Sequence, residues 1–585
     1  MNIIGISAFY HDSACALVVD GKLVAAAQEE RFTRRRYDKD LPLHAFRACL
    51  KDAGLSPADI DCVAYYEDPV KKLGRQLWME LPRGTTGGPP VVLDATFPER
   101  QIRDRLGFDG RLEVVGHHEA HAASAFYCSG FAEAALFTAD AVGEWATTSY
   151  GVGSEHGVTL LEEVPFPHSF GLLYSAITSY LGFSVNSDEY KVMGLASYGT
   201  PRYRKQLDAL VLSAEGAQFR LDQRYFDLRP SGRMYTDRLA ELLGIPPRPP
   251  GSEVTRDHED LACSIQSLIE ELLLAKLDHL HERQPSENLC YAGGVALNCV
   301  ANSRLRRRGR FRNWFVPPAP GDAGSAAGAA LLAHHRLTGT RRVERMVDAR
   351  LGPRPGGGST LAGVLDAAGV GYEDFGGRRS ELLDAAADLL SRGNILGWFQ
   401  DRMEFGPRAL GSRSILADPR DPRMRDRINQ LVKKREEFRP FAPAVAAERS
   451  TEYFDLEVPS PFMLETVAVC PGADLPAITH VDGSARVQTV DADVDPLFHA
   501  LLLRFGEATG VPVLLNTSFN VRGEPIVCDE IDALSAFVRA RLHVLVAGDL
   551  LVRHEDLPPT WFAHADRAWA HRQPVAHNDV YTFFV

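Results

Sequence analysis

Two histidines four residues apart, His117 and His121, are the strongest chemical signal in the sequence. The alanines of HHEAHAASAF favour a helix over residues 119–126, and side chains four apart on a helix share a face. Asp140 follows the next apolar run, at the end of a predicted strand. Imidazoles together with a carboxylate suit iron, zinc or manganese. The spacing alone is more often that of ordinary histidines near a helix start, so the metal hypothesis depends on the rest of the chain. His118 is expected to point elsewhere.

Asp322 begins a predicted helix of small residues, GDAGSAAGAAL. As an N-cap, its side chain would bond the first free amides of that helix. As a further metal ligand, it would complete a set of two histidines and two aspartates. The sequence leaves both interpretations open.

Three stretches of the first half could bind a phosphate or a nucleotide. Adjacent glycines after a strand, in AGGVALN, let a ligand approach the backbone, and the next helix start favours an anion. Their spacing matches neither common phosphate fingerprint. Glu189 and Lys191 precede a glycine, although such a pair is usually a solvated helix face. The loop containing His11 could hold a phosphate by its amides or be a surface turn.

The second half concentrates cations and amides beside short apolar strands. Arginine suits planar, bidentate capture of phosphate or carboxylate, whereas any single arginine is more often a surface ion pair. The candidates are Arg402, Arg408, Arg413, Lys433, Lys434, Arg435, Arg439, His480, Arg486 and Gln488. Asn516, Ser518 and Asn520 follow an apolar strand. Ser518 lacks the G-x-S-x-G elbow and is not expected to be a nucleophile.

We expect the elements that position these residues to form two α/β domains. A chain of 585 residues is too long for one hydrophobic core. Strand patterns that open the chain recur after a helical part, which predicts an internally duplicated α/β domain. Asp20-Gly21 predicts a hairpin turn. The stretch at residues 352–360 is rich in Gly and Pro and places the boundary at about residue 350. The predicted elements are strands 3–7, 15–19, 22–28, 134–140, 147–153 and 158–164, helices 42–53 and 257–283, and loops 83–90 and 246–251.

Composition narrows the class of protein. A formal net charge of −13 disfavours nucleic acid as a partner. No apolar run approaches the ~20 residues of a membrane span, and no leader pattern is present, so we expect a cytoplasmic protein without a membrane partner. Nine cysteines without a C-x-x-C pair predict free thiols.

The motifs together resemble the O-carbamoyltransferases of antibiotic and nodulation-factor biosynthesis, of the tobramycin, cephamycin and nodulation types. The resemblance spans nearly the whole chain and rests on IIGISAFYHDSACALVVDGKLVAAAQEERF, HHEAHAASAF, DEYKVMGLASYG, AGGVALN, GDAGSAAGAAL, FGPRALGSR, FRPFAP, HVDGSARVQTV and NTSFN. It implies that residues 1–350 form a duplicated actin-like ATPase domain, similar to the tRNA threonylcarbamoyl-transfer enzymes. It also implies that residues 351–585 form an α/β domain similar to the threonylcarbamoyl-adenylate synthase (YrdC-like) fold.

The resemblance also implies cofactors and site residues. Fe2+, or another divalent ion, would be bound by His117, His121, Asp140 and Asp322. ATP, with Mg2+, would be held near Glu189, Lys191, Gly293, Gly294, Asn298, Ser518 and Asn520. Carbamoyl phosphate would be held by Arg408, Lys433, Arg439, Arg486 and Asn516. Catalytic roles would fall to His11 and Ser518.

The implied activity is that of a one-carbon group transferase. It would convert carbamoyl phosphate and ATP to carbamoyl adenylate and carbamoylate a hydroxyl of a natural product, either an antibiotic or a glycoside. Two alternatives remain: a tRNA threonylcarbamoyl-modification enzyme and a non-catalytic actin-like nucleotide-binding regulator. The acceptor cannot be identified from the sequence, and the oligomeric state stays open, with a homodimer as one option.

Overall fold

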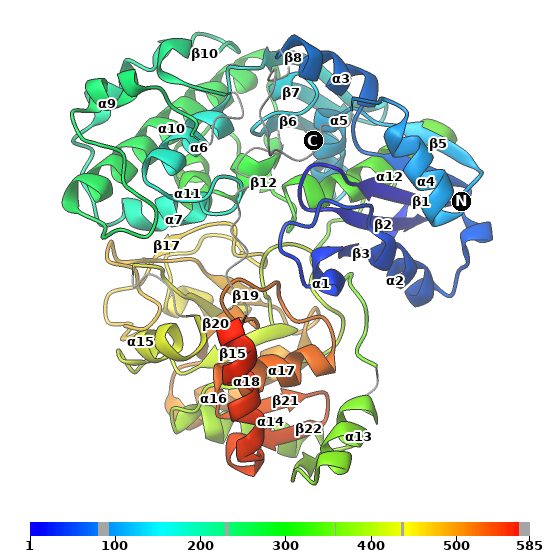
Figure 1. Ribbon diagram of the computed structural model, residues 1–585, viewed down its shortest axis with the longest axis vertical. Helices are drawn as coiled ribbons and strands as arrows, with labels where there is room; N and C mark the ends of the chain where they lie inside the picture. The colour runs from blue at the N-terminus through cyan, green and yellow to red at the C-terminus, as the bar shows by residue number, and fades with distance from the viewer. Residues whose placement is uncertain (80–92, 229–232, 357–358, 434–437, 572–585) are drawn as a thin grey trace. The chain divides into compact units, whose positions relative to one another are not determined.

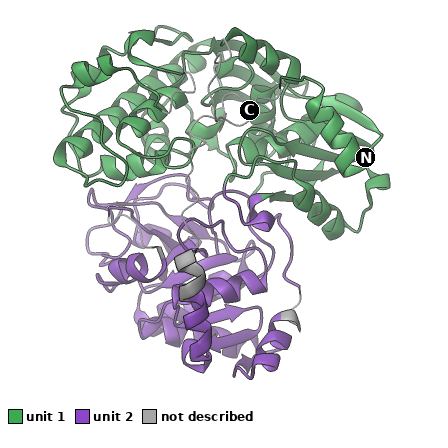
Figure 2. Cartoon of the chain, in the orientation of Figure 1, with its two compact units in different colours: residues 1–29, 37–346, 577–585 green, residues 30–36, 347–576 purple. Residues whose placement is uncertain are grey.

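A computed structural model describes residues 1–79, 93–228, 233–356, 359–433 and 438–571 of the chain (Figure 1). These residues form two compact units (Figure 2). Within the described residues, the first contains Met1–Glu29 and Tyr37–Met346, and the second contains Glu30–Arg36 and the chain from Val347 to His571. The predicted loop at 83–90 lies outside the described residues, as do residues 357–358 of the predicted connector.

The first sheet of unit 1 has the strand order β3-β2-β1-β4-β5. β1 is antiparallel to β2, which is antiparallel to β3, while β4 and β5 run parallel to β1. The predicted hairpin turn joins β2 to β3. Its two residues, Asp20 and Gly21, both have positive φ, as this type of turn requires. The strands are β1 (Asn2–Ser7), β2 (Ala14–Val19), β3 (Lys22–Gln28), β4 (Cys62–Tyr65) and β5 (Arg111–Val114).

The second sheet of unit 1 repeats this topology in the order β12-β11-β6-β7-β8. β6, β7 and β8 form an antiparallel meander, and β11 and β12 run parallel to β6. Unit 1 is therefore a duplicated α/β structure. The strands are β6 (Ala134–Ala139), β7 (Ala146–Ser154), β8 (Gly157–Pro165), β11 (Asn288–Ala292) and β12 (Asn313–Phe315).

Helix α12 (Asp322–Thr338) packs against both β1 and helix α5 (His117–Phe126). Glycine permits this close approach. A Cβ added at Gly328 would lie 1.8 Å from the carbonyl oxygen of Ala120, and one added at Gly5 would lie 1.8 Å from that of Ala326. The small residues of α12 thus bring its backbone against the helix that carries both histidines.

Other helices cover the two sheets. The long helix α10 (Arg256–Arg283) packs against α7 (Glu189–Ala196), α6 (Phe170–Tyr180) and α11 (Cys299–Arg308), and α2 (Leu43–Ala53) packs against β2 and β3. The predicted helices 42–53 and 257–283 correspond to α2 and α10 within one residue at each end.

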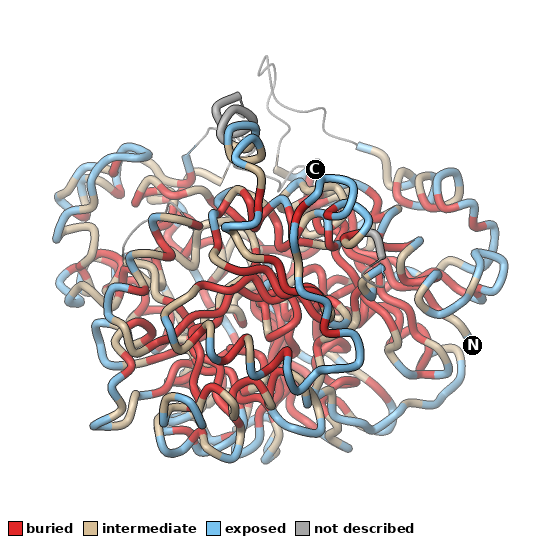
Figure 3. Tube along the Cα trace, turned by 90° about the horizontal axis from the view of Figure 1, so that it is seen from below, coloured by how far each residue is buried: buried red, intermediate tan, exposed pale blue. Residues whose placement is uncertain are grey.

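Unit 2 is built on a mixed eight-stranded sheet of order β13-β22-β21-β14-β15-β20-β16-β19. Its strands are β13 (Glu373–Asp374), β14 (Leu396–Phe399), β15 (Arg413–Ala417), β16 (Ala442–Ala446), β19 (Gln488–Val490), β20 (Val513–Ser518), β21 (Val544–Ala547) and β22 (Leu550–Arg553). Alternate residues of each central strand enter two separate cores. Ile415 and Leu515 face α13 (Ser359–Ala368) and α17 (Glu530–Ala540), while Leu416 and Leu514 face α14 (Arg379–Ser391) and α16 (Pro496–Thr509). Both faces are therefore covered, and buried residues follow the strands (Figure 3).

Unit 2 also includes a short segment from early in the chain, Glu30–Arg36, with helix α1 (Glu30–Thr33). Arg34 donates hydrogen bonds to the carbonyls of Pro525 (2.9 Å) and Ile526 (2.6 Å). Nothing in the local sequence pattern indicated this grouping. All nine cysteines are free thiols, and none of the helices in the described ranges has the length and apolar character to cross a membrane.

Candidate functional site

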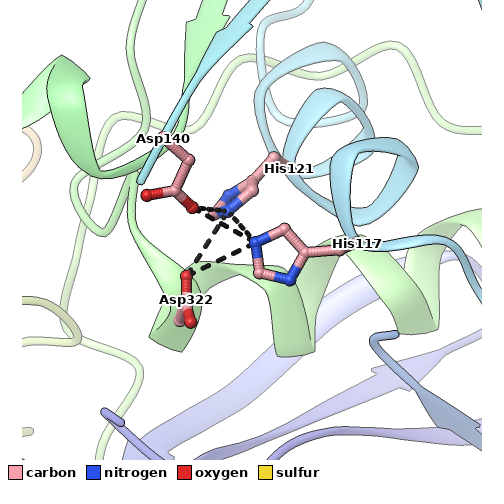
Figure 4. Close-up of side chains that lie close together, drawn as sticks. All are labelled: His117, His121, Asp140 and Asp322. Atoms are coloured by element: carbon pink, nitrogen blue, oxygen red, sulfur yellow. Dashed lines mark hydrogen bonds and ion pairs between the residues drawn. The ribbon is translucent and has the colours of Figure 1, made fainter. Parts of the chain in front are cut away.

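The two histidines and two aspartates converge on one point (Figure 4). Helix α5 supplies His117 and His121, Asp140 follows β6, and Asp322 is the first residue of α12. The Nε2 atoms of the histidines lie 3.0 Å apart, and Asp140 Oδ2 lies 3.2 Å from that of His117 and 3.0 Å from that of His121. Asp322 Oδ1 lies 3.7 and 3.5 Å from the same nitrogens. Gly321, rather than Asp322, is the residue before the helix.

This cluster has the features of a cation site. All four side chains are buried, and their candidate ligand atoms lie within 4.8 Å of one another. Within the described residues, Asp322 Oδ2 is buried and has no hydrogen-bond partner. Burial lowers the pKa of His121, but Asp140 and Asp322 outweigh it and raise that pKa to about 9. Two carboxylates crowded this way require positive charge nearby, and the mixed nitrogen and oxygen donors fit a divalent transition metal.

Two side chains that the sequence analysis missed hold the ligands in place. Ser325 Oγ lies 3.0 Å from Nδ1 of His121 and so orients that ring. Glu144 Oε1 accepts the backbone N–H groups of His117 (2.9 Å) and Asp68 (2.7 Å). Ser325 lies one helical turn after Asp322, and that spacing was a usable signal.

His118 faces away from the cluster, as its position on the helix indicated. Its Nδ1 lies 2.7 Å from the hydroxyl oxygen of Thr138 and 3.0 Å from that of Ser149. Burial holds the pKa of His118 well below its ordinary value, so the ring is neutral. It is part of the protein interior beside the cluster.

His11 reaches the edge of the cluster from the loop between β1 and β2. Its Nδ1 lies 3.0 Å from Asp12 Oδ2, and its Nε2 lies 3.8 Å from Asp322 Oδ2. Phe9 and Asp12 have φ values of 70° and 54°, a strained conformation for residues other than glycine. Burial lowers the pKa of His11, but Asp322 and Asp12 outweigh it and raise that pKa to about 10.

The glycine pair of AGGVALN lies against the same cluster. Gly293 has φ 96°, and a Cβ there would lie 2.2 Å from the carbonyl oxygen of Ala139. The N–H of Gly294 donates to Asp140 Oδ1 at 3.4 Å. Packing against the end of β6 therefore already requires a glycine at position 293.

The other nucleotide candidates of unit 1 have partners within the protein. Glu189 accepts hydrogen bonds from Ser175 Oγ and the N–H of Asn186, both at 2.8 Å. Lys191 Nζ lies 3.0 Å from Asp188 Oδ2. Asn298 accepts the N–H of Ala301 at the start of α11. Nucleotide binding at these residues stays a prediction.

In unit 2, strand directions bring several predicted residues to one edge of the sheet. β16 and β19 run parallel, so Arg439 and Arg486, which precede them, enter at the same edge. β20 is antiparallel to β16 and β15, so its last residue, Ser518, and the loop before β15, with Arg408, also lie there. This edge gathers the four residues from distant parts of the sequence. The side chain of Lys433 is outside what the structure describes, as are Lys434 and Arg435.

Polar side chains at this edge bond to one another. Asn516 Nδ2 donates to Gln488 Oε1 at 2.8 Å, and Ser518 Oγ donates to Asn520 Oδ1 at 2.8 Å. In the described part of unit 2, the buried atoms Asn516 Oδ1, Arg486 Nε and His480 Nε2 have no hydrogen-bond partner. Such atoms are costly to bury, which fits an edge that binds a polar ligand.

Two of the arginines are anchors instead. Arg413 is fully buried, stacks on Phe399, and donates to the carbonyls of Gln400 (2.6 Å) and Asp401 (3.0 Å). Arg402 donates to the carbonyls of Leu351 and Gly352. Both hold backbone in place.

The chain therefore combines two α/β units, and the first of them is duplicated and contains a buried cluster of histidines and carboxylates. Residues 2–78 and 100–331 match the carbamoyltransferase N-terminus, and residues 387–554 match the carbamoyltransferase C-terminus. The chain belongs to the carbamoyltransferase family.

Individual known proteins are also similar to this chain. The chain is 43% identical to an uncharacterised protein of Synechocystis sp., over 93% of this chain and 95% of that protein. It is 38% identical to the nodulation protein NolNO of Sinorhizobium fredii, over 94% of this chain and 80% of that protein. Among solved structures, HypF of T. kodakarensis matches with a TM-score of 0.32 and 16% identity, covering 58% of this chain and 49% of that one.

Proposed function

We propose that the protein is an ATP-dependent O-carbamoyltransferase. Unit 2 makes carbamoyl adenylate from carbamoyl phosphate and ATP, and unit 1 transfers the carbamoyl group to a hydroxyl of a natural product, either an antibiotic or a glycoside. The observation that carries the proposal is the buried cluster of His117, His121, Asp140 and Asp322, with His11 at its edge, in a chain of the carbamoyltransferase family.

His117, His121, Asp140 and Asp322 would hold Fe2+ or another divalent cation. When bound, such an ion supplies Lewis acidity that favours a more nucleophilic hydroxyl or a more polarised carbonyl. Ser325 would orient the imidazole of His121 for this role, and Glu144 would hold the backbone at His117. His11 would be near enough to form a hydrogen bond with a substrate at the cluster. Its raised pKa favours a protonated ring, which donates that hydrogen bond.

We assign the formation of carbamoyl adenylate to the edge of the unit 2 sheet. Arg408, Arg439, Arg486 and Lys433 would bind the anionic groups of carbamoyl phosphate, with Asn516, Ser518 and Asn520 beside them. Carbamoyl phosphate, ATP and one water give carbamoyl adenylate, pyrophosphate and phosphate. Mg2+ would accompany ATP. Glu189, Lys191, Gly293, Gly294 and Asn298 are the nucleotide-binding residues proposed for unit 1.

Transfer completes the reaction. The acceptor oxygen forms a bond to the carbamoyl carbon, the bond from that carbon to the AMP phosphate oxygen breaks, and AMP leaves with the electron pair. The hydroxyl proton is released. Preorganised donors stabilise the charge that develops on the carbonyl oxygen and on the leaving phosphate.

Separation of the two half-reactions tests the proposal. Arg408→Ala should strongly slow carbamoyl adenylate formation but still carbamoylate an acceptor from supplied synthetic carbamoyl adenylate, and His117→Ala should do the reverse. Each loss should be roughly two to three orders of magnitude in rate. Products from an extract of the host, heavier by one carbamoyl group, would identify the acceptor. The division of labour is wrong if Arg408→Ala cannot use the supplied intermediate.

A tRNA threonylcarbamoyl-modification enzyme is the second candidate, because of the resemblance in both units. The net charge of −13 counts against it. Binding of tRNA at moderate salt would favour it. ATP turnover that does not depend on carbamoyl phosphate would favour a regulator over the carbamoyltransferase.

A further inference from the structure

A buried carboxylate organises the loop that carries Arg408. Glu404 Oε1 accepts three backbone N–H groups, those of Leu410 (2.7 Å), Ser412 (2.8 Å) and Arg413 (3.1 Å). Glu404 is only 3% exposed. Because all three amides come from the residues just after Arg408, this one oxygen fixes the shape of the loop on its amide side.

The carbonyl groups of the same loop are held by side chains from distant parts of unit 2. Gln488 Nε2 donates to the carbonyl of Leu410 at 2.7 Å, and Asn516 Nδ2 donates to that of Ala409 at 3.4 Å. Arg31, in the early segment that belongs to unit 2, donates to the carbonyl of Gly406 at 2.8 Å. Both N–H groups and carbonyl groups of the loop backbone are thus hydrogen-bonded to side chains of unit 2.

The second oxygen of Glu404 shows that this arrangement is costly. Oε2 is buried, and within the described residues it receives no hydrogen bond. Burial lowers the pKa of the neighbouring Arg413, and the charge of Glu404 opposes that shift. One oxygen of this carboxylate is buried without a hydrogen bond from any described residue, while the other accepts three backbone N–H groups. The side chain therefore stabilises the conformation of the loop although its own burial is unfavourable.

We infer that Glu404 is a positioning residue for anion capture, which acts by holding the 404–413 loop so that Arg408 meets carbamoyl phosphate in a fixed orientation. The inference rests on the proposed function of the unit 2 edge. Gly411 adds to the constraint, since it has φ 113° and a Cβ there would lie 2.4 Å from Phe498 Cδ1. An arginine on an unconstrained loop would lose conformational entropy on binding, whereas one on this loop is already placed.

The test compares Glu404→Ala with Glu404→Gln. The alanine variant leaves three amides without an acceptor, and its KM for carbamoyl phosphate should rise about 100-fold. The glutamine variant keeps an oxygen that can accept them, so its KM should rise less than about tenfold. In both variants the KM for ATP should change less than about threefold, and transfer from supplied carbamoyl adenylate should be retained.

Asp418→Asn is the matched control. Asp418 is a buried carboxylate that accepts the N–H of Arg420 at 2.9 Å, but it follows the opposite end of β15. Its loss should leave the KM for carbamoyl phosphate unchanged. If Asp418→Asn raises that KM as much as Glu404→Ala does, or if Glu404→Ala raises the KM for ATP equally, Glu404 is merely structural and the inference is overturned.

A third variant separates this inference from the proposed function. If Arg408→Ala raises the KM for carbamoyl phosphate and Glu404→Ala does not, only the role of Glu404 is wrong. If Arg408→Ala leaves that KM unchanged, the assignment of the edge itself fails.

Discussion

Nε2 of His117 and Nε2 of His121 lie 3.0 Å apart in a fully buried setting, and both face the same carboxylate oxygen of Asp140. Two ring nitrogens at this separation cannot both carry protons without repulsion. A cation bound between them would remove the conflict, because neutral imidazoles direct lone pairs toward it.

The first prediction concerns metal content. The purified protein should contain about one iron, or another divalent transition metal, per chain, and a His117→Ala/His121→Ala double variant should lose it. Elemental analysis is the measurement. His118→Gln is the control, since His118 bonds Thr138 and Ser149 instead. Equal metal in the double variant would refute the site.

The second prediction concerns Ser325→Ala. This change removes the hydrogen bond to Nδ1 of His121 and leaves all four ligands in place, so metal affinity should fall roughly 10- to 100-fold. Competition with a chelator measures it. Ser264→Ala, a buried helical serine that bonds Tyr203 and Asp260, should leave the affinity unchanged. No difference between the two variants would remove Ser325 from the site.

The third prediction concerns Gly328→Ala. Its methyl group would lie 1.8 Å from the carbonyl oxygen of Ala120, so α12 and α5 must separate. We expect a loss of about 1–3 kcal/mol in the free energy of unfolding, together with weaker metal binding, because these helices supply three of the four ligands. Gly363→Ala, in a helix with open space around it, should be neutral or slightly stabilising. Unaltered metal affinity in Gly328→Ala would show that the cluster tolerates the shift.

The fourth prediction concerns the stability of unit 2 in acid. Burial lowers the pKa of His480 to about 4, with Asp482 opposing the shift and Arg486 reinforcing it. As pH falls below the ordinary pKa of about 6.5, the unfolded chain binds a proton that the folded chain does not, so stability is lost toward pH 4.

Wild type should therefore lose about 2 kcal/mol more than His480→Asn between pH 7 and pH 5. Urea unfolding followed by tryptophan fluorescence measures the difference, and the exposed His564→Asn variant is the control. Parallel losses in wild type and His480→Asn would assign the acid sensitivity to other groups.

Local patterns in the sequence determined several elements of unit 1. The hairpin at Asp20-Gly21, the strands of the two meanders and the helix of HHEAHAASAF depend on residues close together in the chain, since turn chemistry and side-chain periodicity act over short distances. The same spacing placed His117 and His121 on one helical face. The amino-acid types also predicted nitrogen and oxygen ligands for a metal ion, and an arginine-rich site for an anion.

Only the tertiary structure decided which of these residues meet. Whether Asp322 caps a helix or joins Asp140 depends on the approach of α12 to α5, which Gly328 of α12 permits but no local pattern specifies. The same holds for the two arginines of one loop, since Arg413 is buried and bonds backbone carbonyls whereas Arg408 lies at the sheet edge. It also holds for Glu404, which accepts three backbone N–H groups that only the fold of the loop brings together. Which distant residues meet is set by helix packing and by the register of the strands. Both depend on contacts among many elements rather than on any local stretch of sequence.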